Sequence, residues 1–276
     1  MISEDANSAG NKPGESVALR VEDCSLQLGG NEILRAISFE VREGESVCVI
    51  GPNGAGKSSL LRCLDGLERR FTGGVSVFGR PLASYSRRKF AAEVSYVPQA
   101  VDHWIPFTAR EFVLMGRYPH LTPWTSASDR DRIATDEALD LSGARPFAER
   151  MLPTLSGGER QQVYLAAALA QQAKILLWDE PTTYLDYQHQ EKIVGLLSRL
   201  NRELGTTVIS VSHDVNQACL LSERILAIKQ GRLAFDGSGE ELMSNDVLEG
   251  IYDKPFEFVS HPRTGRTMIL PRDEPR

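Results

Sequence analysis

The sequence predicts an α/β protein built around a largely parallel β-sheet. Short apolar runs alternate with helical patterns from residue 46 onward, and a glycine-rich turn at 51–56 separates one run from the next helix. Such alternation is typical of parallel strands whose two faces are covered by helices.

The N-terminal part predicts a different kind of sheet. Between residues 17 and 49, apolar residues alternate in short runs broken by turns, a pattern typical of antiparallel strands. Residues 46–50 then form a buried strand, and a helix runs through about Leu67. Further short strands are expected at 75–78 and 94–97.

The middle of the chain is expected to be helical. Thr108 with Glu111 predicts a capping box that opens a helix to about residue 117. A second helix is expected at 128–141, closed by Gly143. We therefore assign about 100–155 to an α-helical subdomain inserted into the α/β core.

The last third alternates strands and helices. After an Ala-rich helix at 156–172, the expected order is a strand at 175–178, a helix at 188–204, a strand at 207–211, a helix at 215–221 and strands at 225–228 and 233–235. We divide the chain into a flexible tail (1–16), a main domain (17–240) and a C-terminal extension (241–276) of open role.

Composition excludes several classes of protein. With 41% hydrophobic and 25% charged residues, the 276-residue chain can form a sizeable core. A net charge of −6 argues against a nucleic-acid partner. No apolar stretch approaches the roughly 18 residues needed to span a bilayer, and the polar N-terminus does not resemble a signal peptide. The four scattered cysteines (Cys24, Cys48, Cys63 and Cys219) predict reduced thiols in or near the core.

The most specific motif occupies residues 51–59. It reads Gly51, Pro52, Asn53, Gly54, Ala55, Gly56, Lys57, Ser58, Ser59 and fits G-x-x-x-x-G-K-[ST] between a strand and a helix. In such a loop, backbone amides surround phosphates at a helix N-terminus. We expect Lys57 to reach the β- and γ-phosphates and the Ser58 hydroxyl to ligate Mg²⁺.

Two carboxylates and a histidine follow predicted strands. Asp179 and Glu180 end the strand at 175–178, where ligands gather in open α/β sheets. We expect Asp179 to hold the Mg²⁺ shell and Glu180 to orient or deprotonate an attacking water. His213 follows the next strand on the same predicted edge, which favours a γ-phosphate contact over a solvated surface position.

Residues 155–159 read Leu155, Ser156, Gly157, Gly158, Glu159. Ser156 and Glu159 alone would suffice as a helix cap, yet two adjacent glycines lower helix propensity without local gain. The two glycines would be explained if their backbone amides, unshielded by side chains, approach a phosphate.

Taken in order, these elements resemble the nucleotide-binding domain of ATP-binding-cassette (ABC) proteins across about 17–240. Residues 51–59 resemble Walker A, Leu155–Glu159 the signature, and Asp179 with Glu180 Walker B and the catalytic glutamate. The resemblance implies that Gln99 is the Q-loop residue, acting in catalysis and at the metal, and that Asp186 belongs to a nucleotide-binding D-loop.

The resemblance also implies partners. Two cassettes would pair head to tail, with ATP and Mg²⁺ between Walker A of one and Ser156, Gly157 and Gly158 of the other. A single cassette without a membrane span implies two separate permease subunits, a periplasmic or surface binding protein, and a place on the cytoplasmic face of the membrane. One alternative is a soluble ABC ATPase that acts in translation or repair without a transport role. Another is a nucleotide-binding regulatory subunit that does not hydrolyse ATP, against which the presence of Lys57, Asp179, Glu180 and His213 argues.

Finer motifs resemble one branch of importers. Residues 116–120, 181–186, 213–218 and 261–265 are similar to ATPases that energise uptake of iron–siderophore complexes, haem or cobalamin. One position departs from the family pattern, because Leu28 stands where an aromatic residue usually stacks on adenine. We therefore expect weak discrimination between bases.

Overall fold

The structure, a computed structural model, describes residues 16–99, 104–121, 126–181, 187–262 and 264–271. The strands within these ranges are β1 (Val17–Leu28), β2 (Asn31–Arg42), β3 (Ser46–Ile50), β4 (Phe71–Val77), β5 (Arg80–Pro81), β6 (Val94–Val97), β7 (Ile175–Asp179), β8 (Thr207–Val211), β9 (Arg224–Lys229), β10 (Arg232–Ser238), β11 (Phe256–Ser260) and β12 (Thr267–Pro271).

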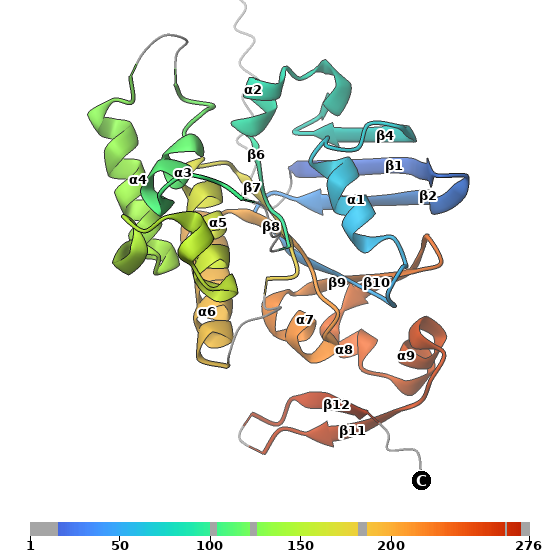
Figure 1. Ribbon diagram of the computed structural model, residues 1–276. Helices are drawn as coiled ribbons and strands as arrows, with labels where there is room; N and C mark the ends of the chain where they lie inside the picture. The colour runs from blue at the N-terminus through green and yellow to red at the C-terminus, as the bar shows by residue number, and fades with distance from the viewer. Residues whose placement is uncertain (1–15, 100–103, 122–125, 182–186, 263, 272–276) are drawn as a thin grey trace, which may run out of the picture.

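Helices connect most of these strands (Figure 1). The α-helices are α1 (Lys57–Leu64), α2 (Arg87–Ala91), α3 (Ala109–Met115), α4 (Asp129–Ser142), α5 (Gly157–Ala170), α6 (Tyr187–Leu204), α7 (Val215–Leu221), α8 (Gly239–Leu242) and α9 (Asn245–Tyr252). The 3-10 turns are η1 (Leu82–Ser84), η2 (Arg145–Phe147) and η3 (Leu152–Thr154). Among the described residues, no helix combines the length and apolarity that crossing a membrane requires.

The central sheet confirms the predicted parallel architecture. Its strand order in the described residues is β10-β9-β3-β8-β7-β6, with every neighbouring pair parallel except β9 with β10. The carboxyl ends of β3, β6, β7 and β8 therefore meet at one edge. The residues that follow these four strands are the ones on which the predicted site depends.

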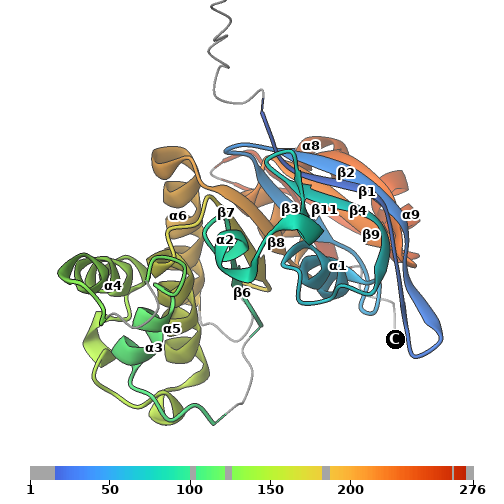
Figure 2. The same cartoon turned by 90° about the horizontal axis from the view of Figure 1, so that it is seen from above.

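The N-terminal strands form a second, antiparallel sheet, as predicted. Its order is β2-β1-β4-β5, and β1 and β2 are joined by a turn at Gly29 and Gly30. Both glycines have positive φ angles, 57° and 83°, which suits a tight hairpin. Figure 2 shows this sheet beside the central one, away from α3, α4 and α5.

The helical part contains α3, α4 and α5, which pack together on the other side of the molecule (Figures 1 and 2). The predicted capping box at Thr108 is present, as are boxes at Ser128 and Ser156. Helix α3 ends at Met115 rather than near residue 117. The subdomain boundaries at about 100–155 and the division at 240 remain predictions.

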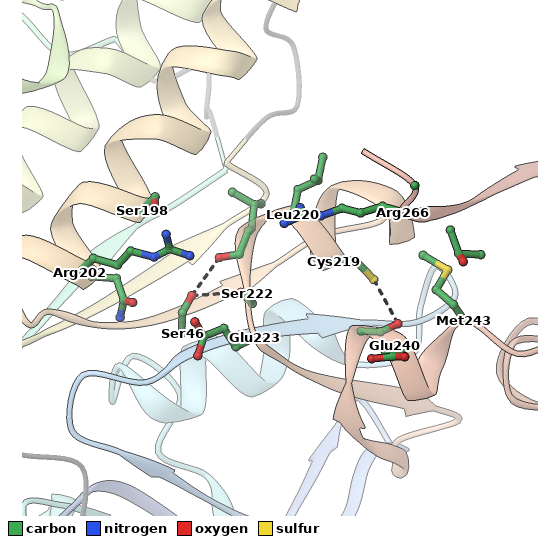
Figure 3. A pocket seen from close by; sticks show the side chains of 15 residues that line it. Ser46, Ser198, Arg202, Cys219, Leu220, Ser222, Glu223, Glu240, Met243 and Arg266 are labelled. Atoms are coloured by element: carbon green, nitrogen blue, oxygen red, sulfur yellow. Dashed lines mark hydrogen bonds between the residues drawn. The ribbon is translucent and has the colours of Figure 1, made fainter. Parts of the chain in front are cut away.

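A cavity of about 670 Å³ opens beside the C-terminal elements (Figure 3). It is lined by residues of α6, α7 and α8, by the turn before β12 and by Ser46, which begins β3. Because the predicted phosphate loop follows the other end of β3, this cavity is at the opposite edge of the sheet from the predicted site.

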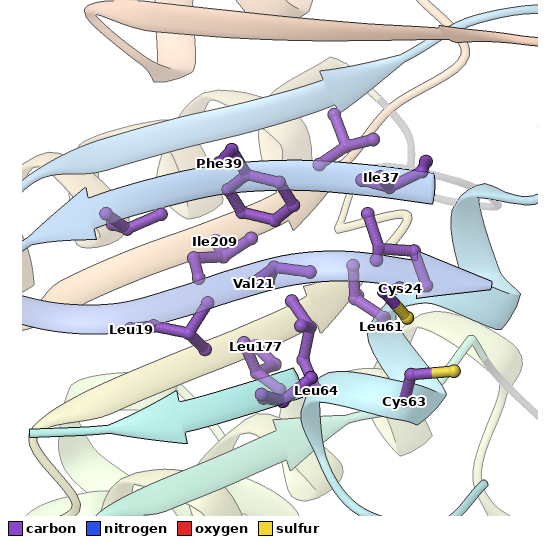
Figure 4. Close-up of a cluster of buried hydrophobic side chains, with 14 of the residues drawn as sticks. Leu19, Val21, Cys24, Ile37, Phe39, Leu61, Cys63, Leu64, Leu177 and Ile209 are labelled. Carbon is purple, nitrogen blue, oxygen red and sulfur yellow. The ribbon is translucent and has the colours of Figure 1, made fainter. Parts of the chain in front are cut away.

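The central sheet is covered on both faces. Ile175 and Leu177 of β7 pack into a core with α1 and the antiparallel sheet, where Figure 4 shows Leu64 beside Leu177. Leu176 and Trp178 point to the other face and pack with α3, α4, α5 and α6. Helices α1 and α5 therefore lie on opposite faces of the sheet.

The cysteines match the prediction of thiols in or near the core. Cys24, Cys48 and Cys63 are buried, Cys219 is half-buried, and all four are free. Figure 4 shows Cys24 and Cys63 at one end of the core between α1 and the antiparallel sheet. A hydrogen bond between these two thiols raises the pKa of Cys63.

Candidate nucleotide-binding site

The predicted phosphate loop leaves the carboxyl end of β3 and enters α1. Its path needs glycine at two places. Gly51 has a φ of 139°, and a Cβ there would lie 2.0 Å from the carbonyl oxygen of Ile228. Gly56 has a φ of 104°, and its Cβ would lie 2.8 Å from the carbonyl oxygen of Ile33. The loop is thus held closely between β9 and β2.

The turn between β9 and β10 supports the same loop. Gly231 donates its N–H to the carbonyl of Ala55 at 3.2 Å and accepts from the N–H of Arg35 at 2.8 Å. A Cβ on Gly231 would lie 2.6 Å from the carbonyl oxygen of Ile33, so this position also requires glycine. This role of Gly231 is not visible in the sequence, where the glycine only separates the strands expected at 225–228 and 233–235.

The N-terminus of α1 is open to an anion. Its N-cap, Gly56, offers no side-chain hydrogen bond, whereas α2, α3, α4, α5, α7, α8 and α9 each begin at a side-chain cap. The first-turn amides of α1, including those of Ser58 and Ser59, therefore meet no capping side chain. These amides and the helix dipole favour a phosphate group.

Lys57 curls back over the loop. Its ammonium Nζ donates to the carbonyls of Gly51 at 2.8 Å and Pro52 at 2.9 Å, and only 7% of the residue is exposed. Burial lowers the pKa of Lys57, while the nearby Glu180 and Asp179 carboxylates oppose that shift. A phosphate in the loop would replace two carbonyl partners with charged oxygens, which bind an ammonium more strongly.

Ser58 and Asp179 meet across the site. The Ser58 hydroxyl donates to Oδ1 of Asp179 at 3.1 Å. Burial raises the pKa of Asp179, whereas hydrogen bonds from Ser58 and Tyr96 act to lower it. A hydroxyl and a carboxylate are hard oxygen donors of the kind that Mg²⁺ takes together with phosphate oxygens and water.

The donor set fits Mg²⁺ only with nucleotide present. Among the described residues, no cluster of three or more His, Cys, Asp or Glu side chains could hold a metal ion. Ser58 and Asp179 would thus supply two ligand positions, and phosphates and water would supply the others.

Glu180 is held in a rare backbone conformation. Its φ of 53° lies in the left-handed region, which a non-glycine residue adopts at a cost of about 1–3 kcal/mol. Its N–H donates to the carbonyl of Val211, and its own carbonyl accepts from the Gln161 side chain. These bonds hold the backbone of Glu180 at the end of β7.

Gln99 and His213 converge on that carboxylate. Nε2 of Gln99 donates to Oε2 of Glu180 at 2.9 Å, and Nδ1 of His213 lies 3.7 Å from the same oxygen. Gln99 follows β6 and His213 follows β8, so the predicted convergence at one sheet edge is found. Gln99 thus contacts Glu180, and its expected place at the metal stays a prediction.

Gln161 is a site residue that sequence analysis missed. It is 2% exposed on α5, and its Nε2 donates to the carbonyls of Glu180 at 3.3 Å and Pro181 at 3.1 Å. It therefore ties the helix that begins at Ser156 to the end of β7. A polar residue on the inner face of an Ala-rich helix was the available signal, but its partner could not be read from the sequence.

The signature segment begins with a capping box within its own chain. The Ser156 hydroxyl accepts from the N–H of Glu159, and the Glu159 carboxylate accepts from the N–H of Ser156 and from Arg150. A Cβ on Gly157 would meet nothing within 4 Å, so contacts within the chain do not explain this glycine. Gly158 follows in the first turn of α5.

The remaining predicted site residues are in the phosphate loop, at Leu28 and in the D-loop. Asn53 and Gly54 are exposed in the loop, and Gly54 has a φ of 77°. Leu28 is partly buried against the core. Asp186, together with Tyr184 and Leu185, lies outside the described residues.

Comparison with known proteins agrees with this geometry. Residues 34–183 match the family described as ABC transporter, which is more than half of the chain. The chain belongs to the ABC transporter family. Its mixed α/β cassette, antiparallel sheet and helical subdomain are those of the family.

Two ABC relatives and one solved structure are informative. The chain is 39% identical over 96% of its length to the hemin import ATP-binding protein HmuV of Rhodococcus jostii, covering 90% of that protein. It is 36% identical over 93% of its length to the iron(3+)-hydroxamate import ATP-binding protein FhuC of Bacillus subtilis, covering 95% of that protein. A metal-chelate type ABC transporter in an inward-facing conformation superimposes with a TM-score of 0.81 at 26% identity, covering 94% of this chain and 98% of that chain.

Proposed function

We propose that this ABC protein is the ATP-hydrolysing subunit of an importer for haem or an iron–siderophore complex. The observation that carries the ATPase part is the meeting of Lys57, Ser58, Asp179, Glu180 and His213 at one sheet edge. Kinship with hemin and iron-hydroxamate import proteins supports the importer part.

The geometry suggests how each residue acts. The loop amides and Lys57 bind the β- and γ-phosphates. Ser58 and Asp179 would hold Mg²⁺, which would supply positive charge for the leaving ADP. Glu180 orients a water and takes its proton as the water oxygen attacks the γ-phosphorus. The bond between that phosphorus and the β–γ bridging oxygen breaks, giving ADP and phosphate. His213, beside Glu180, contacts the γ-phosphate, and Gln99 holds the Glu180 carboxylate.

A head-to-tail pair of cassettes completes the site. Cassettes of this family are found as dimers within transporter complexes that contain permeases. In this chain α1 and α5 lie on opposite faces of the sheet, and Gly157 faces open space. Both features favour binding of the Ser156–Gly158 turn to nucleotide on a second copy.

An apolar surface near α3 suits the permease subunits. Five large apolar residues with exposed fractions of 38–79% lie on α3 or near its ends: Trp104, Phe107, Met115, Tyr118 and Met151. The first four are close to α3 in sequence, and Met151 is next to its start through the strand bridge with Thr108. Exposed apolar patches of this kind mark interaction sites. The surface begins shortly after Gln99, so a permease there would place the cassette at the cytoplasmic face of the membrane, with a binding protein outside.

The cargo is selected by other subunits of the transporter. The two relatives import different compounds, hemin and iron-hydroxamate, at nearly equal identity to this chain. We propose that a haem or siderophore complex is selected by the permease and binding protein, and that this chain does not touch it. Cobalamin, the third cargo of the predicted branch, has no support from these two relatives.

A pull-down with Glu180→Gln tests the proposal. This variant should bind ATP without turnover and stay paired, so tagged protein from solubilised source-cell membranes with ATP should recover about one integral membrane subunit per cassette. Lys57→Ala is the control, because loss of phosphate binding should abolish ATP-dependent pairing. Recovery of a soluble dimer alone, or of a translation or repair complex, would overturn the transport part. Unchanged turnover in Glu180→Gln would overturn the ATPase assignment.

A further inference from the structure

The C-terminal elements share a hydrophobic core with two parts of the candidate site. Leu248 and Ile251 of α9 and Ile269 of β12 pack with Ile50, which precedes the phosphate loop, and with Val215 of α7. Lys229 of β9 also donates to the carbonyl of Gly250 at 2.7 Å and to Asp253 at 2.6 Å. The extension is therefore an integral part of the cassette and not a loose appendage.

One polar contact joins the β11–β12 hairpin to α7. Nδ2 of Asn216 donates to the carbonyl of Ile269 at 2.9 Å, and Oδ1 of Asn216 accepts from the N–H of Ile269 at 2.9 Å. The side-chain amide thus pairs with one backbone residue through both of its polar atoms, as a neighbouring strand would. Ile269 is 8% exposed, so breaking this pair would leave backbone groups poorly solvated.

Helix α7 begins immediately after His213. Asp214 is its N-cap and accepts from the N–H of Gln217 at 3.1 Å, while Ser212 accepts from the N–H of Asp214 at 3.0 Å. The helix has only seven residues. A helix this short has little stability of its own, so tertiary contacts determine where it lies.

The histidine depends on that placement. Its side chain is 53% exposed, and its contact with Glu180 spans 3.7 Å. Few groups therefore surround the imidazole, and its position follows the backbone of residues 212–214. Because Asn216 is the second residue of α7 and only three residues beyond His213, a shift of α7 would move His213 relative to Glu180.

We propose that Asn216 is a positioning residue for ATP hydrolysis. Through its pair with Ile269, the β11–β12 hairpin holds α7, and α7 holds His213 beside Glu180. The inference rests on the proposed role of His213 and assigns the C-terminal extension a part in turnover.

Single-turnover ATP hydrolysis by the full chain tests this role. Asn216→Ala should lower the hydrolysis rate about tenfold and change the KM for ATP less than twofold, because the phosphate loop is untouched. Asn201→Ala is the matched control. Asn201 likewise holds backbone groups, because it donates to the carbonyls of Gly44 and Thr206, and among the described residues no hydrogen bond joins it to α7. The rate of Asn201→Ala should therefore stay within twofold of wild type. If Asn216→Ala fails to fold by circular dichroism, Asn216→Asp, which keeps the acceptor for Ile269, takes its place.

A double-mutant cycle separates positioning from general destabilisation. In a His213→Ala background, Asn216→Ala should cause no further loss of rate, since the residue that it positions is gone. A second, full loss in that background, or an unchanged rate for Asn216→Ala alone, would overturn the inference. If His213→Ala itself keeps the wild-type rate, the proposed role of the histidine fails, and this inference fails with it.

Discussion

The hydroxyl of Ser58 donates a 3.1 Å hydrogen bond to Oδ1 of Asp179, although 121 residues separate the two in sequence. Ser58 lies in the first turn of α1 and Asp179 ends β7, and these two elements pack into the same core, which brings the two oxygens together. The pair marks where Mg²⁺ would sit between the loop and the sheet edge.

Removal of the Ser58 hydroxyl should change how the turnover rate depends on Mg²⁺ concentration. Ser58→Ala is expected to lower kcat on the order of 100-fold, as loss of metal-site partners does elsewhere. ATPase rates measured across a Mg²⁺ titration check this, and chelation of Mg²⁺ should stop the wild-type enzyme. Ser58→Thr keeps the hydroxyl and should retain most activity. Equal Mg²⁺ curves for Ser58→Ala and wild type would refute the metal assignment.

Leu28 should limit the recognition of the base. An aromatic stack is worth about 0.5–1.5 kcal/mol, so Leu28→Tyr should lower the KM for ATP by roughly 2- to 12-fold. Wild type should hydrolyse ATP and GTP with similar efficiency. Steady-state kinetics with both nucleotides test the two statements, and Leu28→Ile serves as a non-aromatic control. A strong preference of wild type for one base would contradict the prediction.

Asp65 should make stability depend on pH. Burial raises the pKa of this carboxyl from 3.8 to about 7, so the folded protein holds the proton more tightly than the unfolded chain. The resulting stabilisation is complete below about pH 4 and is lost as pH rises through 7. Asp65→Asn should therefore be more stable than wild type at pH 8, by about 1–2 kcal/mol after allowance for solvent at this half-buried group.

Thermal melts at several pH values measure this difference. The Asp65→Asn advantage of a few degrees at pH 8 should shrink steadily as pH falls to 4. Glu137→Gln, on an exposed carboxylate of α4, should show no such trend. A constant difference at all pH values would show that titration of Asp65 is not the cause.

Arg117 should be essential to the helical part. It is 2% exposed, pairs with Asp131 at 3.0 Å and donates to the carbonyl of Ala170 at 2.6 Å. Arg117→Met would leave Asp131 with 10% side-chain exposure and without its cation, at a cost of about 3–5 kcal/mol.

Urea unfolding is the measurement for Arg117. The control is Arg199→Ala, which removes an exposed pair with Glu203 and should cost less than about 1 kcal/mol. If both variants lose the same small amount, the pair between Arg117 and Asp131 does not hold α3 and α4 together.

The sequence correctly predicted which residues meet at the edge of the sheet, because each of these motifs is recognised from a local pattern. The phosphate loop, Asp179, Glu180 and His213 each follow an apolar strand, and parallel strands end at a common edge. For residues 116–120 the sequence showed only a similarity to one branch of importers and no structural role. A Cβ on Gly116 would lie 2.2 Å from the carbonyl oxygen of Ala167, so this glycine allows α3 to approach α5, and Arg117 is buried behind it.

Long-range contacts account for what sequence analysis missed. Gln161 and Asn216 act through backbone groups 19 and 53 residues away, and no local pattern identifies such partners. The left-handed backbone of Glu180 is equally invisible in the sequence, since nothing marks a glutamate as a turn residue. The C-terminal strands were not predicted, because their burial depends on α7 and not on a regular pattern.

The capping box at Ser156 has a consequence for the pairing of two cassettes. The reciprocal hydrogen bonds between Ser156 and Glu159 fix the shape of the first turn of α5 in the isolated chain, so the turn is preorganised. Association of two copies would therefore cost no conformational entropy for ordering that turn. Almost all of the free energy of its interaction with nucleotide would then contribute to the affinity between the two copies. A rigid recognition surface of this kind favours fast, reversible docking over slow induced fit.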